Sequence, residues 1–301
     1  MSFKKDLVKS LLKKNKIIPS KYHYDFQGSK YFEKITKQKE YYLTRKEKEI
    51  LKTISKKVPP IFFENLSFVE LGSGASDKIS ILLNKKVKFY LPLDISLKFI
   101  KQSSRKLKKK YPNLIIKPFK VDYSKPFKIP KINKSKKVCF FLGSSIGNFH
   151  NNEEIKFLNN IYKSIGNNNY LFIGVDLLKN KKIIETAYND KAGYSAKFNL
   201  NLIDVINKKF FTNINKNDFS YMSKFNSKKK CMQSFIVSKK FQSFKIDNKV
   251  FFLKKNEPIQ TEISKKFTIS SFHKLATSTN WKVCNYWLDK KAYYSIFLLK
   301  S

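Results

Sequence analysis

The sequence predicts a doubly wound α/β domain, and three observations lead to this prediction. Short runs of β-branched and aromatic residues within 67–176 alternate with stretches of helical spacing, as in a parallel sheet covered on both faces. The first run, 67–71, ends in a turn with Gly72 and Gly74, where a backbone can pass close to a ligand. The chain closes with runs 281–288 and 292–300 around a tight turn, typical of an antiparallel pair in a mixed sheet.

The individual elements follow from the same patterns. Thr44 and Glu47 have the spacing of a capping box and predict that a helix begins there. Further helices are expected from Asp77, after Ser96, and over 151–165 and 270–280. The predicted strands are 67–71, 87–94, 113–121, 137–143 and 170–176.

From about residue 180 the pattern changes. Two helical stretches, 181–190 and 196–210, precede an Asn- and Lys-rich segment and then several strand candidates. One of these is "PIQTEISKKF", in which the two-residue period of a strand puts Glu262 and Ser264 on one face. A second, smaller domain is therefore expected.

The composition restricts the class of protein. No apolar run has the eighteen or so residues of a membrane span, and the basic N-terminus lacks the pattern of a signal peptide. A cytoplasmic protein with no membrane partner is expected. The three Cys and three His residues are scattered, so neither a disulfide framework nor a metal site is predicted.

The net charge of +41 raises the question of nucleic-acid binding. Only Arg45 and Arg105 are arginines, whereas phosphates and guanine edges are usually bound by guanidinium groups. Abundant Lys, Asn, Ile and Phe are also what an A/T-rich coding sequence produces. Lysines that solvate the surface are the favoured interpretation, and a basic RNA-binding protein or RNA methyltransferase remains the less favoured alternative.

The ends of the predicted strands carry residues suited to a nucleoside. Asp94 ends the second strand about twenty residues after Gly72, the separation expected of a ribose-binding carboxylate. Asp122 and Tyr123 follow the third strand, while Gly143 and Asn148 follow the fourth. Asp77 occupies the place of the third glycine in the dinucleotide fingerprint. S-adenosylmethionine is thus favoured over a nicotinamide dinucleotide.

Ordered motifs over nearly the whole chain resemble the histidine-specific methyltransferases, in particular the Nα-methyltransferases of ergothioneine biosynthesis. They include "EYYLTRKEKEIL", "ELGSGASDK", "YLPLDIS", "FLGSSIGN" and "TEISKKF". The resemblance implies a Rossmann-like class I methyltransferase that uses S-adenosyl-L-methionine to methylate L-histidine three times at its α-amino group, giving hercynine. Methylation of another amino acid or small amine is the alternative.

The resemblance also assigns site residues, position by position. The implied cofactor-binding residues are Tyr24, Gly72, Lys78, Asp94, Asp122, Tyr123 and Gly143. The implied substrate-binding residues are Tyr41 and Tyr188 for the carboxylate, Asn148 for the amine, and Glu262 and Ser264 for the imidazole. Without the resemblance, the tyrosines would be interpreted as packing residues and Ser264 as a solvated strand residue.

One departure from the family pattern affects the expected pocket. The segment that usually resembles "IEMWL" is "CMQSF" here, so Gln233 and Ser234 replace a methionine and a tryptophan of the substrate wall. The expected domains are a cofactor domain over 47–180 and 267–301 and a substrate domain over 1–46 and 181–266, with the active site between them. A monomer without a nucleic-acid partner is expected.

Overall fold

The computed structural model describes residues 3–58, 66–84, 87–130, 136–150, 152–246 and 248–301. The chain divides into two compact units. Unit 1 contains residues 1–41 and 180–264, and unit 2 contains residues 42–179 and 265–301. Each unit is described separately below. In the described ranges, no helix has both the length and the apolar character needed to cross a membrane.

Unit 2 is built on one mixed sheet. Among the described residues it has eight strands, in the order β13-β14-β7-β6-β2-β3-β4, with β5 also paired to β3. The pairs among β2, β3, β6 and β7 are parallel, and β14 is antiparallel to both β7 and β13. The strands are β2 Ser67–Leu71, β3 Phe89–Asp94, β4 Ile115–Ile116, β5 Phe119–Lys120, β6 Lys137–Phe141, β7 Tyr170–Asp176, β13 Lys282–Leu288 and β14 Tyr294–Lys300.

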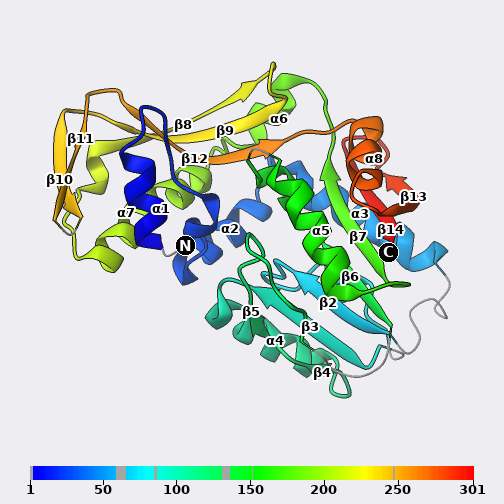
Figure 1. Ribbon diagram of the computed structural model, residues 1–301. Helices are drawn as coiled ribbons and strands as arrows, with labels where there is room; N and C mark the ends of the chain where they lie inside the picture. The colour runs from blue at the N-terminus through cyan, green and yellow to red at the C-terminus, as the bar shows by residue number, and fades with distance from the viewer. Residues whose placement is uncertain (1–2, 59–65, 85–86, 131–135, 151, 247) are drawn as a thin grey trace. The chain divides into compact units, whose positions relative to one another are not determined.

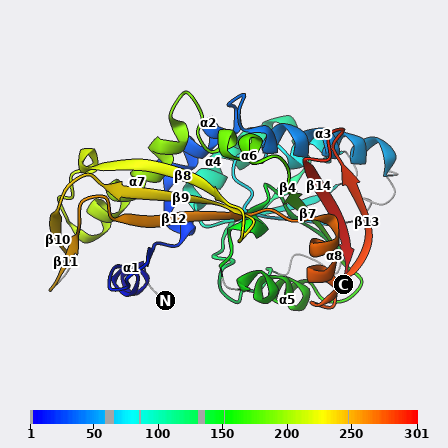
Figure 2. The same ribbon diagram turned by 90° about the horizontal axis from the view of Figure 1, so that it is seen from above.

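Helices cover both faces of this sheet, which confirms the predicted doubly wound α/β fold. Figure 2 shows α3 (Tyr42–Lys57) and α4 (Leu97–Lys110) on one face, and α5 (Glu153–Ile165) and α8 (Ile269–Thr277) on the other. Successive side chains along each strand point to opposite faces of the sheet. Val69 and Phe141 join the core under α5 and α8, whereas the ring of Phe140 stacks on that of Phe172, 5.3 Å away, and is not part of that core.

Three local predictions in unit 2 were wrong or incomplete. Helix α3 begins at Tyr42, so Thr44 and Glu47 lie inside it and form no capping box. The helix expected from Asp77 is only the short 3-10 helix η3, Ile79–Ile81. The strand expected over 113–121 is divided into β4 and β5.

Unit 1 combines helices with a smaller sheet. Its sheet order is β1-β12-β9-β8, and β10 and β11 form a separate antiparallel pair; Figure 1 shows β8, β9 and β12 side by side. The strands are β1 Lys16–Ile17, β8 Phe219–Asn226, β9 Cys231–Ser238, β10 Gln242–Ile246, β11 Lys249–Leu253 and β12 Pro258–Lys265. The helices are α1 Phe3–Leu11, α2 Phe26–Thr36, α6 Lys181–Ala187 and α7 Tyr194–Phe210, with short 3-10 helices η1 Ser20–His23 and η5 Lys216–Asp218.

The core of unit 1 lies between α7 and the strands. Leu202, Ile203 and Ile206 occupy one face of α7 because residues three and four apart are neighbours on a helix. They pack with Ile236 of β9 and with Ile259 of β12. This packing fixes α7 against the small sheet, and a pocket forms where the N-terminal part of α7 meets the sheet.

Candidate active site

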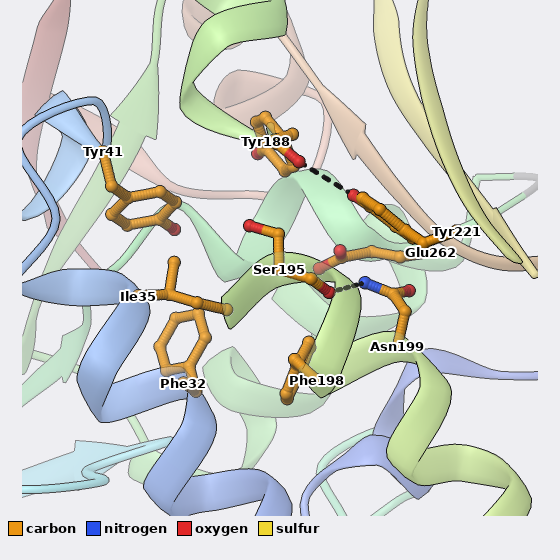
Figure 3. A pocket seen from close by; sticks show the side chains of 9 residues that line it. All are labelled: Phe32, Ile35, Tyr41, Tyr188, Ser195, Phe198, Asn199, Tyr221 and Glu262. Carbon is orange, nitrogen blue, oxygen red and sulfur yellow. Dashed lines mark hydrogen bonds between the residues drawn. The ribbon is translucent and has the colours of Figure 1, made fainter. Parts of the chain in front are cut away.

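A pocket with about 290 Å³ of space not occupied by atoms, part of it open to solvent, lies within unit 1. Figure 3 shows its lining side chains, which come from α2, α7, β8, β12 and the segments around Tyr41 and Tyr188. The lining residues are Phe32, Ile35, Tyr41, Tyr188, Ser195, Phe198, Asn199, Tyr221 and Glu262. Three residues of the predicted substrate site, Tyr41, Tyr188 and Glu262, are thus brought together although they are far apart in the sequence.

Helix α7 contributes three of these residues at helical spacing. Ser195, Phe198 and Asn199 are three and four residues apart and therefore share a face. The buried carboxylate of Asp190 accepts hydrogen bonds from the amides of Tyr194 and Ser195, each 2.7 Å long. Because the first amides of a helix have no partner within it, Asp190 fixes the start of α7 and so the direction of this face.

Tyr221 connects two parts of the pocket wall. Its hydroxyl donates a 2.9 Å hydrogen bond to the backbone carbonyl of Tyr188 and lies 3.3 Å from the hydroxyl of Ser234. Burial, with the nearby carboxylate of Glu262 in support, raises the pKa of Tyr221. Tyr221 therefore keeps its proton near neutral pH and acts as a donor to the Tyr188 carbonyl.

Strand β12 brings the acidic residue of the pocket. Glu262 lines the cavity, and Ser264 is buried two residues further along the same strand. The neighbouring Thr261 is fully buried and donates a 2.6 Å hydrogen bond to the side-chain carbonyl of Asn199. Since Asn199 also donates to the Ser195 carbonyl over 2.9 Å, the hydrogen bonds join β12 to the pocket face of α7.

Aromatic rings pack against Phe198, which lies on the pocket face of α7. The ring of Tyr24 lies 5.7 Å from that of Phe32 and 5.3 Å from that of Phe198. The ring of His23 stacks on Phe198 at 4.8 Å, and its Nε2 lies 3.1 Å from the Thr261 carbonyl. Burial lowers the pKa of His23 to about 4, so this histidine is neutral at physiological pH and behaves as a packing residue.

The replaced residues of β9 lie at different distances from the cavity wall. The side-chain carbonyl of Gln233 accepts a hydrogen bond from Asn226 (3.2 Å), and its amide lies 3.5 Å from the carbonyl of Gln260. Gln233 is not among the residues that line the pocket, and Ser234 reaches the wall through the Tyr221 hydroxyl. The departure noted in the sequence therefore changes the polar support of the pocket more than its lining.

In unit 2, the turn after β2 has the form that a nucleoside cofactor requires. Gly72 and Gly74 have φ values of +66° and +50°, in the left-handed region that favours glycine. A Cβ atom added at Gly74 would meet no described heavy atom within 4 Å, so the turn leaves open space. Asp94 at the end of β3 accepts hydrogen bonds from the amides of Gly74 (3.2 Å) and Ser96 (2.9 Å). This fits the predicted cofactor, with the carboxylate of Asp94 held beside the turn.

Asp122 and Tyr123 follow β5 at the same edge of the sheet. Asp122 accepts a 3.1 Å hydrogen bond from the Ser124 amide, which forms a local turn. The Tyr123 hydroxyl lies 3.6 Å from the position that a Cβ of Gly72 would occupy, and its ring packs edge-on against Phe141 at 5.3 Å. Burial raises the pKa of Tyr123, so its hydroxyl also remains protonated.

Lys78 and Gly143 are joined by Glu47, a residue predicted from its spacing to belong to a helix cap. The buried carboxylate of Glu47 forms an ion pair with the Lys78 ammonium, with 2.6 Å between Nζ and Oε2. Its other oxygen accepts hydrogen bonds from the Gly143 amide (2.7 Å) and from the Tyr294 hydroxyl (2.6 Å). Glu47 thus links the turn after β2 with the loop after β6.

The last predicted residue, Asn148, ends the 3-10 helix η4, Ser145–Asn148. The preceding residue, Gly147, lies against the backbone of Lys265, because a Cβ at this position would be 2.7 Å from the Lys265 carbonyl oxygen. A glycine is needed there for close backbone contact. The contact ties the backbone next to Asn148 to the last residue of β12.

A buried ion cluster occupies the end of β7. Asp176 pairs with Lys179 at 2.5 Å and with Lys266 at 2.7 Å, and accepts a 2.9 Å hydrogen bond from Tyr42. Burial alone would raise the pKa of Asp176, but the two lysines hold it below its ordinary value. Burial lowers the pKa of Lys179 to about 8.

Sequence reasoning missed several of these residues. Phe198 and Asn199 carried a detectable signal, because they lie in the helix predicted over 196–210, whereas Ser195 lies one residue before that predicted helix and inside the observed α7. Tyr221 carried no such signal, since its role depends on a hydrogen bond to Tyr188 across 33 positions of sequence.

Comparisons with known proteins agree with the geometry. A sequence model of the family described as "Histidine-specific methyltransferase, SAM-dependent" matches residues 3–301. A histidine N-alpha-methyltransferase of Mycolicibacterium smegmatis is 28% identical over 297 residues, which cover 96% of this chain and 91% of the relative. A protein of the same name from Mycobacterium tuberculosis is 27% identical over 307 residues, which cover 99% of this chain and 94% of the relative.

A solved structure supports the fold alone. Magnesium protoporphyrin IX methyltransferase from Synechocystis, solved with bound S-adenosylhomocysteine, superposes with a TM-score of 0.52 at 9% identity. The match covers 93% of this chain and 97% of that chain. The fold is therefore that of the Rossmann-like class I methyltransferases.

Proposed function

Because the chain belongs to the family of histidine-specific, S-adenosylmethionine-dependent methyltransferases, we propose that it methylates the α-amino nitrogen of L-histidine, with the trimethylated betaine hercynine as product. The observation that carries this proposal is the pocket of unit 1, which Tyr41, Tyr188 and Glu262 line together. The resemblance implies a role in ergothioneine biosynthesis, and a relative named "Ergothioneine biosynthesis protein 1" from Neurospora crassa is 30% identical over 192 residues, which cover 61% of this chain and 22% of the relative.

The acidic side of the pocket supports a histidine side chain. A carboxylate accepts hydrogen bonds only, so Glu262 would bind the N–H of an imidazole and leave an aliphatic side chain without a partner for it. Phe32 and Phe198 supply apolar walls on which a flat ring can pack. We assign the imidazole to Glu262 together with Ser264.

Tyr41 and Tyr188 line the part of the pocket that suits the carboxylate of histidine. The rings of Tyr41 and Tyr188 are 6.3 Å apart and nearly perpendicular, and both lie at the cavity. Phenol hydroxyls can donate to a carboxylate. We assign the histidine carboxylate to these two tyrosines, and the orientation of the α-amine to Asn148.

Residues of unit 2 are assigned to the cofactor. S-adenosylmethionine supplies a methyl group on a sulfonium, which a neutral amine can attack in line. Gly72 admits the cofactor close to the backbone, and Asp94 would bind the ribose hydroxyls. Asp122 and Tyr123 are assigned to the adenine side. Lys78 and Gly143 of unit 2, together with Tyr24 of unit 1, complete the assigned cofactor residues.

Catalysis by these residues would consist mainly of alignment and exclusion of water. Tyr41, Tyr188 and Asn148 would direct the lone pair of the amine. Each transfer leaves an ammonium of unit positive charge that is larger by one methyl group, and aromatic walls would accommodate such a cation. Each amine must lose a proton before it attacks, and solvent can accept that proton.

The test is an assay with labelled S-adenosylmethionine and each standard amino acid in turn. Histidine should become labelled, and mass spectrometry should show products heavier by one, two and three methyl groups. Label on a different amino acid but none on histidine would replace the proposal with the alternative of another amine substrate. A salt-sensitive shift of RNA, with no transfer to any amino acid, would favour the RNA-binding alternative.

Two accompanying proposals concern the protein as a whole. We expect a monomer, and sedimentation or light scattering would test this. We also expect a cytoplasmic enzyme, where S-adenosylmethionine and histidine are both available. Fractionation of cells would check the location.

A further inference from the structure

Glu47 is a buried charged residue that the assigned histidine and cofactor contacts do not use. It lies inside α3, and its side chain is fully buried. A buried carboxylate is costly unless it is paired and hydrogen-bonded. Each carboxylate oxygen of Glu47 has a partner: Oε2 faces the Lys78 ammonium at 2.6 Å, and Oε1 accepts from Gly143 and Tyr294.

The strand behind this carboxylate is shaped to admit it. Gly174 of β7 has no side chain, and a Cβ there would lie 2.1 Å from Glu47 Oε1 and 2.5 Å from the Tyr294 hydroxyl. Since real Cβ contacts are never this short, glycine at 174 is a condition for the position of the carboxylate. The position of the Glu47 carboxylate is therefore determined by residues from segments that are distant in the sequence, including Gly174 of β7 and Tyr294 of β14.

The partners of Glu47 are residues assigned to the cofactor. Lys78 follows the glycine turn after β2, and Gly143 follows β6 with φ +80°. A Cβ at Gly143 would be 3.0 Å from Lys78 Nζ, so the ammonium lies directly against this glycine. The carboxylate of Glu47 is the group that holds the two strand ends together.

We propose that Glu47 is a positioning residue of the cofactor site, which acts by orienting the Lys78 ammonium and fixing the loop at Gly143. This inference rests on the proposed function. The 2.6 Å ion pair with Glu47 holds the Lys78 ammonium beside Gly143. A lysine ammonium has three N–H donors, and an ammonium kept in this place suits an anionic group such as the carboxylate of the methionine part of S-adenosylmethionine.

The test measures the dissociation constant of S-adenosylhomocysteine for the full chain by titration calorimetry. Glu47→Gln keeps the size of the side chain and an acceptor for Gly143 and Tyr294, but it cannot balance the charge of Lys78. We expect this variant to bind S-adenosylhomocysteine about tenfold more weakly, with the KM for histidine changed less than about twofold. The control is Glu49→Gln on the same helix, an exposed acid that pairs with Lys46 at 2.9 Å, which should retain wild-type affinity.

A double-mutant cycle with Lys78→Met tests whether Glu47 affects cofactor binding through Lys78. If Glu47 acts through Lys78, then Glu47→Gln should weaken binding by less than about twofold once Lys78 is already methionine. Losses that multiply would overturn the inference, because Glu47 would then act independently of Lys78. Unchanged affinity in Glu47→Gln would overturn it as well.

Two further measurements separate positioning from folding and from the proposed function. Urea unfolding without ligand reports whether each variant folds. Gly174→Ala provides a second route if Glu47→Gln does not fold, because it displaces the carboxylate without removing a charge, and it should weaken S-adenosylhomocysteine binding similarly. Unchanged affinity in a folded Gly174→Ala would count against the inference. A wild-type chain that does not bind S-adenosylhomocysteine would instead refute the proposed function.

Discussion

The hydroxyl of Tyr221 on β8 donates a 2.9 Å hydrogen bond to the backbone carbonyl of Tyr188, just after α6. This bond fixes one wall of the pocket to the small sheet of unit 1. The donor is partly buried and its pKa is raised, so the bond persists across the neutral pH range. The position of Tyr188 in the proposed substrate site therefore depends on a residue that binds its backbone carbonyl.

Removal of this donor should weaken histidine binding. Tyr221→Phe leaves the Tyr188 carbonyl without the bond, and we expect the KM for histidine to rise about fivefold and the free energy of unfolding to fall by about 1 kcal/mol. Tyr111→Phe is the matched control, because its hydroxyl also donates to a backbone carbonyl, that of Ser80 at 3.1 Å, but in unit 2. An equal rise of the histidine KM in both variants would contradict the role given to Tyr221.

Glu262 should determine the preference for histidine. Glu262→Ala removes the acceptor proposed for the imidazole N–H, and we expect histidine affinity to fall by about 100-fold while S-adenosylhomocysteine binds as before. Glu33→Ala removes an acid of unit 1 whose partner is Lys37 at 2.8 Å, and it should have no such effect. Unchanged histidine kinetics in Glu262→Ala would show that the residue is misassigned.

Asp94 should determine binding of the cofactor, whereas Glu262 determines binding of histidine. Asp94→Ala removes the carboxylate proposed to bind the ribose and leaves the amides of Gly74 and Ser96 without their acceptor. S-adenosylhomocysteine affinity should fall by about 100-fold in calorimetry. Asp77→Ala, an exposed acid in the same turn, is the control. Equal losses in the two variants would mean that general charge, and not a ribose contact, explains the effect.

His23 should make stability depend on pH in the acidic range. Its pKa is about 4 in the folded chain and about 6.5 when unfolded, so between these values the unfolded state binds more protons. The free energy of unfolding therefore rises with pH from about 4 to about 6.5, and the contribution of His23 is about 3 kcal/mol. His23→Gln cannot titrate and should have a smaller slope in urea titrations over this range. A slope as steep as that of the wild type would show that other groups cause it.

Asp176 should be important for stability. Asp176→Asn would leave Lys179 and Lys266 buried without their counter-charge, and we expect a loss of about 3–5 kcal/mol in urea unfolding. Asp204→Asn is the control, because Asp204 pairs with Lys216 at 2.6 Å on the surface. Surface pairs contribute about 1 kcal/mol or less, so the control should unfold close to the wild-type midpoint.

The sequence determined the elements that repeat a local pattern. Apolar runs such as 137–143 and 170–176 predicted buried parallel strands, and the structure has β6 and β7 there. The glycines after β2 and the aspartate after β3 could be placed at one edge of the sheet for the same reason, because parallel strands end together. Where the local signal was ambiguous the prediction failed, as at Thr44, which lies within α3 instead of capping it.

The functions of individual polar residues required the tertiary structure. Glu47 has the sequence spacing of a capping box, yet its carboxylate contacts Lys78, Gly143 and Tyr294. Tyr221 looks like any strand tyrosine, yet it supports Tyr188. Periodicity reports only which residues share a face of one element. Which elements then meet, and which buried donors find which acceptors, depends on packing between segments far apart in the chain, and only the folded structure contains that information.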